Sequence, residues 1–199
     1  MKHILVSTIL TVISMQPALA DSCQETFVRL LVDGNGDGPV KIHVTQEMKG
    51  GPTTKNIFYQ AVPGHWMTEM VDPADQAWVL TYDNVMYTSS DKGETWDKVR
   101  ELDSESNQDN AKADLKANAA TAKNASCGQE DLDGVMHDVV EADFETLQAF
   151  KTKNHYKYWV NPETGYIAKV IYAMKGEGFE SVSTQSIEAA PDLVLPTPE

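Results

Sequence analysis

Apolar and polar residues alternate along several short segments of the chain, the first of which begins at Val40. Between Val40 and Thr45 every second residue is apolar, as a half-buried β-strand requires. Further candidate strands follow at 55–62, 64–71, 76–82, 84–88 and 95–101, and a second group at 133–143, 155–161, 166–174 and 178–188. Short turns rich in Gly, Pro, Asp and Asn separate neighbouring strands, so the pattern predicts a meander of antiparallel strands.

Several of these candidate strands are apolar on both faces. Val79 alternates with Trp78 and Leu80 on one strand. On a later strand, Tyr172 alternates with Ile171. An antiparallel sheet with one face in water needs apolar residues on the other face only, so we expect both faces to be covered by protein, by the curvature of a barrel or by a ligand. A closed sandwich or barrel with an ordinary packed core is the alternative.

Two further segments lie outside the regular run of candidate strands. Residues 22–32 carry the apolar residues of a short helix or strand, which the glycine-rich run from Asp33 to Gly38 ends. Residues 105–124 are polar and rich in Ala and Lys, so we predict a helix there. Its narrow apolar stripe can lie on a sheet but cannot form a core by itself. The stripe consists of Ala111, Leu115, Ala119 and Ala122.

The first twenty residues have the layout of a cleavable signal peptide. Lys2 and His3 precede an apolar run from Ile4 to Ile13, which is shorter than the roughly 20 residues that span a bilayer. Ala18-Leu19-Ala20 fits a cleavage site, and the mature chain would not begin with a cysteine that could carry a lipid anchor. We therefore predict export to the periplasm, with a retained N-terminal anchor as the alternative. The predicted divisions are a signal peptide at 1–20, a single β-rich domain at 21–190 and a flexible tail at 191–199.

The charge balance excludes one class of partner. The chain has 30 acidic against 16 basic residues, which gives a net charge of −14 at pH 7. Binding to nucleic-acid phosphates requires clustered Lys and Arg, so we do not expect nucleic acid as a partner. An acidic surface also keeps many exported proteins soluble, and the charge therefore says little more.

The two cysteines are expected to form a disulfide. In an oxidising compartment, Cys23 and Cys127 have no other cysteine to pair with. The bridge would close a loop of about 100 residues, which the chain-entropy model values at about 4 to 5 kcal/mol. A free reactive thiol is the alternative.

No metal, cofactor or catalytic group is predicted. The run from Asp33 to Gly38 matches the opening of an EF-hand calcium loop, but Val44 stands where the bidentate Glu is needed. A plain turn is therefore favoured over a calcium site, and calcium binding stays open. The mature histidines are scattered without metal-ligand spacing. They are His43, His65, His137 and His155.

Residues 89–96 fit the S-x-D-x-G-x-T-W pattern of the Asp-box hairpin. In this structural motif the Ser and Asp side chains bond turn amides, and the Trp packs on the core. The pattern predicts a hairpin that joins 84–88 to 95–101. A propeller enzyme would need several such blades, and the chain has one box.

Residues 127–190 carry a series of turn and strand motifs. The series begins with Cys127-Gly128, Leu132-Asp133-Gly134 and the strand through Val139-Val140-Glu141. Its central part runs from Tyr158 to Val170 and matches the hairpin pattern W-[IV]-[DN]-x-x-T-G-x-x-x-K-[VI]. In these motifs the second half of the chain resembles the LolA-like periplasmic lipoprotein carriers. The resemblance implies a mainly β (α+β) fold, in which a curved antiparallel sheet or half-barrel is covered by one or two helices and encloses an apolar cavity for lipid.

These observations rank the functional hypotheses. The first is a periplasmic, non-enzymatic carrier or binding protein for a hydrophobic small molecule or lipid. Flexible thioethers and indole rings on the strands suit such a ligand, although they also fill ordinary cores. The second is an envelope protein-protein interaction module with a solid core and no ligand, and an exported hydrolase comes third. The residues expected to line the cavity are Trp66, Met70, Trp78, Leu80, Met86, Trp159 and Tyr172.

Overall fold

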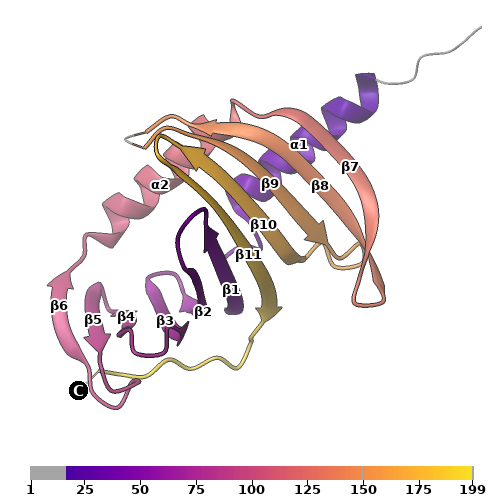
Figure 1. Cartoon of the computed structure of the whole chain (residues 1–199). Coiled ribbons are helices and arrows are strands. Elements are labelled where there is room, and N and C mark those ends of the chain that lie inside the picture. The colour runs from indigo at the N-terminus through magenta and orange to yellow at the C-terminus, as the bar shows by residue number, and fades with distance from the viewer. Residues whose placement is uncertain (1–16, 149, 199) are drawn as a thin grey trace, which may run out of the picture.

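The computed structural model describes residues 17–148 and 150–198 (Figure 1). The predicted signal peptide lies outside the described residues except for 17–20, which belong to the first helix. In chain order, the elements are α1 (Pro17–Asp33), β1 (Val40–Met48), β2 (Thr53–Val62), β3 (His65–Asp72), β4 (Trp78–Tyr82), β5 (Val85–Ser89), β6 (Asp97–Glu101), α2 (Ser104–Ala119), β7 (Lys123–Leu132), β8 (Val135–Thr146), β9 (Thr152–Val160), β10 (Ile167–Gly176) and β11 (Phe179–Ala189).

The strands form one open, curved sheet of 11 strands in the order β6-β5-β4-β3-β2-β1-β11-β10-β9-β8-β7. Every neighbouring pair is antiparallel, and each predicted strand range overlaps an observed strand. The predicted meander is therefore confirmed, as is the mainly β fold class with two covering helices. Two meanders, β1–β6 and β7–β11, are joined where β1 pairs with β11 from Val40↔Ala189 to Met48↔Ser181.

The segment predicted as a short helix or strand is the helix α1. Gly34 ends it with a φ of 54°, and the Gly34 amide donates to the Leu30 carbonyl at 3.0 Å, which is the geometry of a glycine helix cap. The glycine-rich turn that follows is anchored by Asn35. Its side-chain oxygen accepts from the Ile167 amide at 2.7 Å, and its side-chain nitrogen donates to the Ile167 carbonyl at 3.0 Å. Asn35, a candidate calcium-ligand position, thus serves to fasten the end of α1 to β10.

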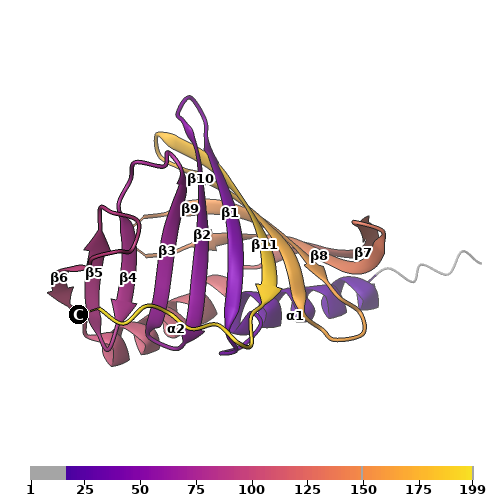
Figure 2. The ribbon, with the colours of Figure 1, turned by 90° about the horizontal axis from the view of Figure 1, so that it is seen from below.

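The main core lies between α1 and β8, β9 and β10. Phe27 is fully buried, and its ring centroid lies 6.1 Å from that of Phe144 and 5.7 Å from that of Tyr158. Figure 2 shows β8 to β10 arching over α1, so the helix lies on the concave side of the sheet. Buried apolar residues of the three strands complete the core: Val140, Ala142, Val160, Ile167 and Val170. Burial of each large apolar side chain contributes about 2 kcal/mol to the free energy of unfolding, so this core is the chief source of stability.

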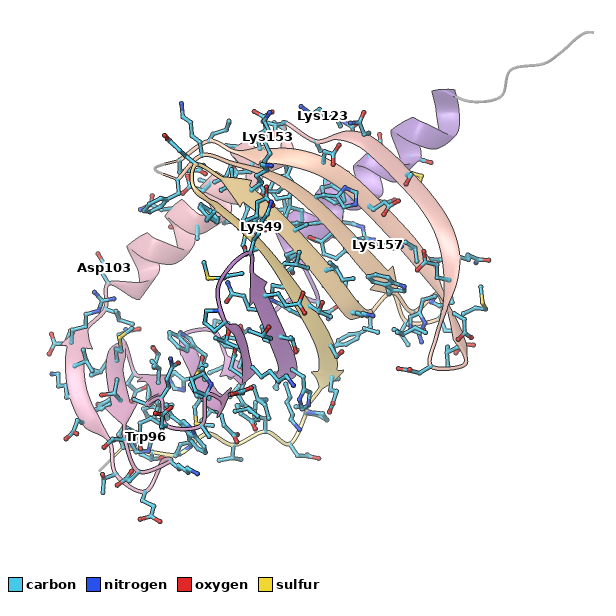
Figure 3. All side chains as sticks on the ribbon, viewed as in Figure 1. Lys49, Trp96, Asp103, Lys123, Lys153 and Lys157 are labelled. Atoms are coloured by element: carbon cyan, nitrogen blue, oxygen red, sulfur yellow. A yellow bond between two sulfur atoms is a disulfide. The ribbon has the colours of Figure 1, made fainter. Side chains whose placement is uncertain are left out.

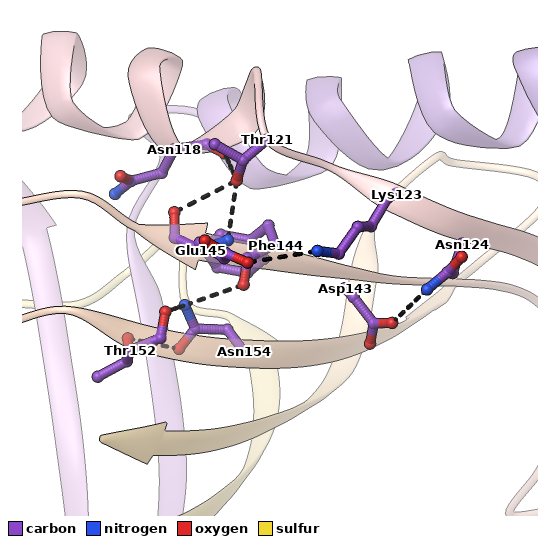
Figure 4. Close-up of polar contacts among 9 residues, drawn as sticks. All are labelled: Asn118, Thr121, Lys123, Asn124, Asp143, Phe144, Glu145, Thr152 and Asn154. Atoms are coloured by element: carbon purple, nitrogen blue, oxygen red, sulfur yellow. Dashed lines mark hydrogen bonds and ion pairs between the residues drawn. The ribbon is translucent and has the colours of Figure 1, made fainter. Parts of the chain in front are cut away.

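The predicted helix at 105–124 is partly wrong. The helix α2 ends at Ala119, and the strand β7 begins at Lys123. Thr121 fixes the change of direction, because its hydroxyl donates to the Asn118 carbonyl at 2.7 Å and accepts from the Glu145 amide at 2.8 Å (Figure 4). The sequence pattern missed β7 because most of its side chains are polar and exposed, so no apolar alternation marks it.

The Asp-box hairpin between β5 and β6 is confirmed. The Ser89 hydroxyl accepts from the Gly93 amide at 2.7 Å, and the Asp91 carboxylate accepts from the Thr95 amide at 2.9 Å. Hydrogen bonds from Thr95 and Ser89 lower the pKa of Asp91 to about 2. Gly93 has a φ of 90°, and a Cβ there would meet the Trp78 ring at 3.2 Å.

The C-terminal tail lies against the convex side of the sheet. After β11 the chain is extended and crosses one end of the strands β1 to β5 (Figures 1 and 2). Leu195 is only 7% exposed and packs with Met67 and Leu80, beside Trp78 and Trp96. The tail therefore supplies the protein cover for apolar residues on the second face of β3 and β4.

The Cys23–Cys127 disulfide is formed and joins α1 to β7, across a sequence separation of 104. It fastens the helix to the edge of the sheet that the apolar pattern did not reveal. Among residues 17–148 and 150–198, no helix has the length and apolar character needed to cross a membrane.

We expect loss of this disulfide to lower the free energy of unfolding by about 2 to 5 kcal/mol, because the open chain regains the entropy that the loop removed. Urea denaturation of the oxidised protein and of the Cys23→Ser/Cys127→Ser double variant measures the difference. Reductant should shift the wild-type midpoint and leave that of the double variant in place. Equal midpoints for the two proteins would show that the bridge adds no stability.

Neighbouring tail residues provide a second test. Leu195→Ala should lower the free energy of unfolding by about 2 kcal/mol, because a buried leucine loses its contacts with Met67 and Leu80. Val194 is 87% exposed, so Val194→Ala should change stability by less than about 0.5 kcal/mol. Thermal melting of both variants measures this difference, and equal effects would mean that the tail does not pack in solution.

Candidate functional site

The strand register assigns the paired residues of each strand to one of the two faces of the sheet. We define the inner face as the one against which α1 packs, and the outer face as its opposite. Val170 belongs to the core beneath α1 and pairs with Gln185. Gln185 pairs with Val44, and Val44 pairs in turn with Asn56. Because paired residues share a face, the inner face can be followed from the helix-covered strands to β1 and β2.

The inner face of β1 to β5 carries a set of apolar side chains that we call the inner apolar patch. Its members are Ile42, Val44, Phe58, Trp66, Met70, Val79 and Met86. Each of them is only partly buried. The Phe58 and Trp66 rings stack with centroids 5.9 Å apart. The two helices make their main contacts with each other and with β7 and β8, so they do not provide the principal cover for this patch.

A buried hydroxyl lies within the inner apolar patch. Thr81 is 2% exposed and pairs with Trp66 on one side and Met86 on the other. None of the described residues forms a hydrogen bond with its Oγ1. A buried polar atom without a partner costs free energy, so this hydroxyl is a candidate contact for a polar group of a ligand.

Tyr172 lies on the inner face but belongs to the region beneath α1. Its ring centroid is 4.2 Å from that of Tyr156, and both rings pack against the main core. Burial raises the pKa of both phenols above the ordinary value. These tyrosines therefore remain neutral and extend the main core along the inner face.

Trp78 and Leu80 lie on the outer face. Leu80 is fully buried, and both residues belong to the cluster that the C-terminal tail covers. The tail occupies the position at which a ligand would have to contact them. Trp78 and Leu80 therefore pack against the C-terminal tail, on the face opposite the inner apolar patch.

Trp159 also lies on the outer face, in a polar setting. Its indole nitrogen donates to Glu130 at 3.1 Å, and the ammonium groups of Lys157 and Lys169 each lie 4.9 Å from the ring centroid. The hydrogen bond from Lys157, at 2.6 Å, lowers the pKa of Glu130. Trp159 is therefore held by charged neighbours instead of lining an apolar surface.

The predicted lining residues are consequently divided between two faces. The structure brings Trp66, Met70 and Met86 together on the inner apolar patch, with Tyr172 further along the same face. Sequence reasoning missed Thr81 and the inner residues of β1. The alternation of side chains was visible, but only the cross-strand register shows which face of each strand continues the inner face.

The outer face contains a pocket of about 670 Å³ near the tips of the β1–β2, β8–β9 and β10–β11 hairpins. Charged side chains and a short apolar floor line it, and none of the predicted lining residues contributes to it. Within residues 17–148 and 150–198, no group of three or more His, Cys, Asp or Glu side chains is arranged to hold a metal ion.

Several solved structures have an arrangement of helices and strands similar to that of this chain. The Pseudomonas aeruginosa MucA/MucB complex matches with a TM-score of 0.45 and 14% identity, over 85% of this chain and 58% of that one. A LolA superfamily protein from Nitrosomonas europaea matches with a TM-score of 0.34 and 9% identity, over 89% and 95%. The hypothetical lipoprotein YmcC from Escherichia coli matches with a TM-score of 0.27 and 11% identity, over 91% and 100%.

The predicted fold is confirmed as an open, curved antiparallel sheet with helices on its concave side. A LolA superfamily protein is among the solved structures with a similar arrangement. The chain spans 58% of the length of the chain from the MucA/MucB complex. No protein-family profile matches the sequence, and no curated protein matches it.

Proposed function

We propose that this protein is a non-enzymatic binding protein of the cell envelope, which holds a hydrophobic ligand such as a lipid acyl chain on the inner apolar patch. The observation that carries the proposal is the partial exposure of every side chain in that patch. A monomeric protein rarely leaves a contiguous apolar surface on a concave face unless it binds something there.

The chemistry of the patch fits an acyl chain. Burial of each methylene contributes about 0.8 kcal/mol, so a ten-carbon segment needs no charged partner for firm retention. Met70 and Met86 can adapt their side-chain conformations to chains of different shape. The Thr81 hydroxyl offers one hydrogen bond to an ester or carboxyl group.

The proposed location is the periplasm. The leader-like segment at the N-terminus supports export, and the Cys23–Cys127 disulfide requires an oxidising compartment. The acidic net charge of −14 is compatible with an exported, freely diffusing protein.

An envelope protein-protein interaction module is the second candidate. It is favoured by the two edges of the open sheet, since within residues 17–148 and 150–198 the strands β6 and β7 each have a single strand neighbour. Every residue of β6 is exposed. An exposed strand edge can pair with a strand of another protein.

The first test is native mass spectrometry, with organic extraction, of the mature protein purified gently from a periplasm. We expect a lipid-sized mass that remains bound in the native protein and is released on denaturation. A clean ligand-free mass under lipid-rich conditions would favour the interaction module, and substrate turnover would contradict both candidates.

Adjacent residues of β3 provide a matched pair of variants. Met70→Gln keeps the side-chain length but places an amide in the inner apolar patch, so we expect lipid retention to weaken about tenfold. Val71 is 45% exposed and lies at a β-bulge outside the inner apolar patch, so Val71→Gln should retain lipid as the wild type does. The amount of lipid bound by each variant, measured under conditions in which both are equally folded, tests whether the lipid lies on the inner apolar patch. Equal retention would remove the inner apolar patch as the site.

A further inference from the structure

The outer-face pocket is bounded by two rows of cross-strand neighbours. The row nearer the hairpin tips runs through Glu145, Lys153, Lys175, Glu180 and Lys49. The adjacent row runs through Asp143, His155, Ala173, Val182 and Glu47. All of these residues line the pocket, together with Lys123. In Figure 3 the labelled Lys49, Lys123 and Lys153 lie along this end of the sheet.

Most of the acidic groups of the pocket already have cationic or amide partners. Glu180 binds Lys49 at 2.7 Å and Lys175 at 2.5 Å, and these two lysines lower its pKa to about 2. Glu145 binds Lys123 at 3.3 Å. Asp143 accepts from the Asn124 side chain at 2.8 Å and lies 2.9 Å from the His155 ring nitrogen. The fourth acidic residue of the pocket, Glu47, lies at the far end of the second row, away from Lys153.

Lys153 is different from the other lysines of the pocket. Among the described residues it has no ion-pair partner within 4 Å. It lies directly opposite Lys175, and two like charges in this position destabilise a sheet. Lys175 shares the single Glu180 carboxylate with Lys49. Glu145, on the other side of Lys153, binds Lys123, so the row nearer the hairpin tips has three lysines against two glutamates.

The floor beside these lysines is apolar. Ala173 and Val182 are paired across β10 and β11, and Val182 is 38% exposed. The lysine side chains add their aliphatic stems to the walls. A pocket of about 670 Å³ lies within the range that holds drug-sized or single-chain lipid ligands.

We propose that this outer-face pocket binds a single-chain anionic amphiphile, whose phosphate or carboxylate head lies between Lys153 and Lys175 and whose alkyl chain lies on Ala173 and Val182. The anion relieves the repulsion between the two lysines and accepts charge-assisted hydrogen bonds from both. The alkyl chain covers the exposed valine. This site lies on the opposite face of the sheet from the inner apolar patch, so it does not depend on the proposed function.

The probe for this site is dodecyl phosphate, below its critical micelle concentration, titrated calorimetrically into the mature, disulfide-bonded protein from which bound lipid has been extracted. We expect one dodecyl phosphate per chain at this site, distinguished from any alkyl chain on the inner apolar patch because Lys153→Met weakens its binding and Met70→Gln does not. Zwitterionic dodecylphosphocholine and inorganic phosphate should each bind at least about tenfold more weakly, because one lacks the net charge and the other lacks the alkyl chain.

Three variants test the residues involved. Lys153→Met keeps most of the apolar stem and should weaken dodecyl phosphate binding about tenfold. Lys41 lies on the outer face of β1 outside the pocket, so Lys41→Met should bind as the wild type does. Glu180→Gln frees Lys49 and Lys175 from their shared carboxylate and should tighten binding severalfold. A gain of affinity cannot result from unfolding.

Unchanged binding by Lys153→Met would overturn the proposal. Equal affinity for dodecylphosphocholine would show an apolar site without anion selection, and equal affinity for inorganic phosphate would show a simple anion site. The Met70→Gln variant separates this proposal from the first one. If it abolishes dodecyl phosphate binding while Lys153→Met does not, the amphiphile occupies the inner apolar patch and the outer-face site is wrong.

Discussion

The pairing of β1 with β11 is the constraint on which the rest of the structure depends. It joins the first strand of the chain to the last, from Val40↔Ala189 to Met48↔Ser181, and makes one sheet of two meanders. Because the side-chain period of a strand is two residues, this register also decides which face of the β2–β6 meander continues the face that α1 covers. A shift of one residue would exchange the inner apolar patch with the cluster beneath the tail.

The two apolar faces of the sheet are covered by different segments of the chain. On the inner face, α1 packs on β8 to β10, and the inner apolar patch of β1 to β5 is left partly accessible. On the outer face, Leu195 of the tail packs over Met67 and Leu80, while the opposite end of the sheet is polar and charged. The two candidate binding surfaces therefore lie on different faces and have different chemistry, one apolar with a buried hydroxyl and the other a lysine-lined pocket with an apolar floor.

Much of the fold could be predicted from local patterns. The strand ranges, the Asp-box turn between Ser89 and Thr95 and the disulfide pair were visible because each depends on residues close in sequence or on the presence of only two cysteines. The strand β7 was not visible. Its place in the sheet is fixed by pairing with β8 and by the Cys23–Cys127 bridge to α1, and neither leaves an apolar alternation in its sequence.

The sequence by itself determined the alternation of apolar and polar side chains, the turns that end each strand and the acidic charge, since all of these follow from local composition and backbone preference. Only the tertiary structure decided which apolar residues meet. It placed Trp66, Met70 and Met86 on one face and Trp78 and Trp159 on the other, because alternation defines two faces of a strand but not which of them the rest of the chain covers. The same holds for the pocket around Lys153, whose lining comes from hairpins far apart in the chain and brought together by cross-strand pairing.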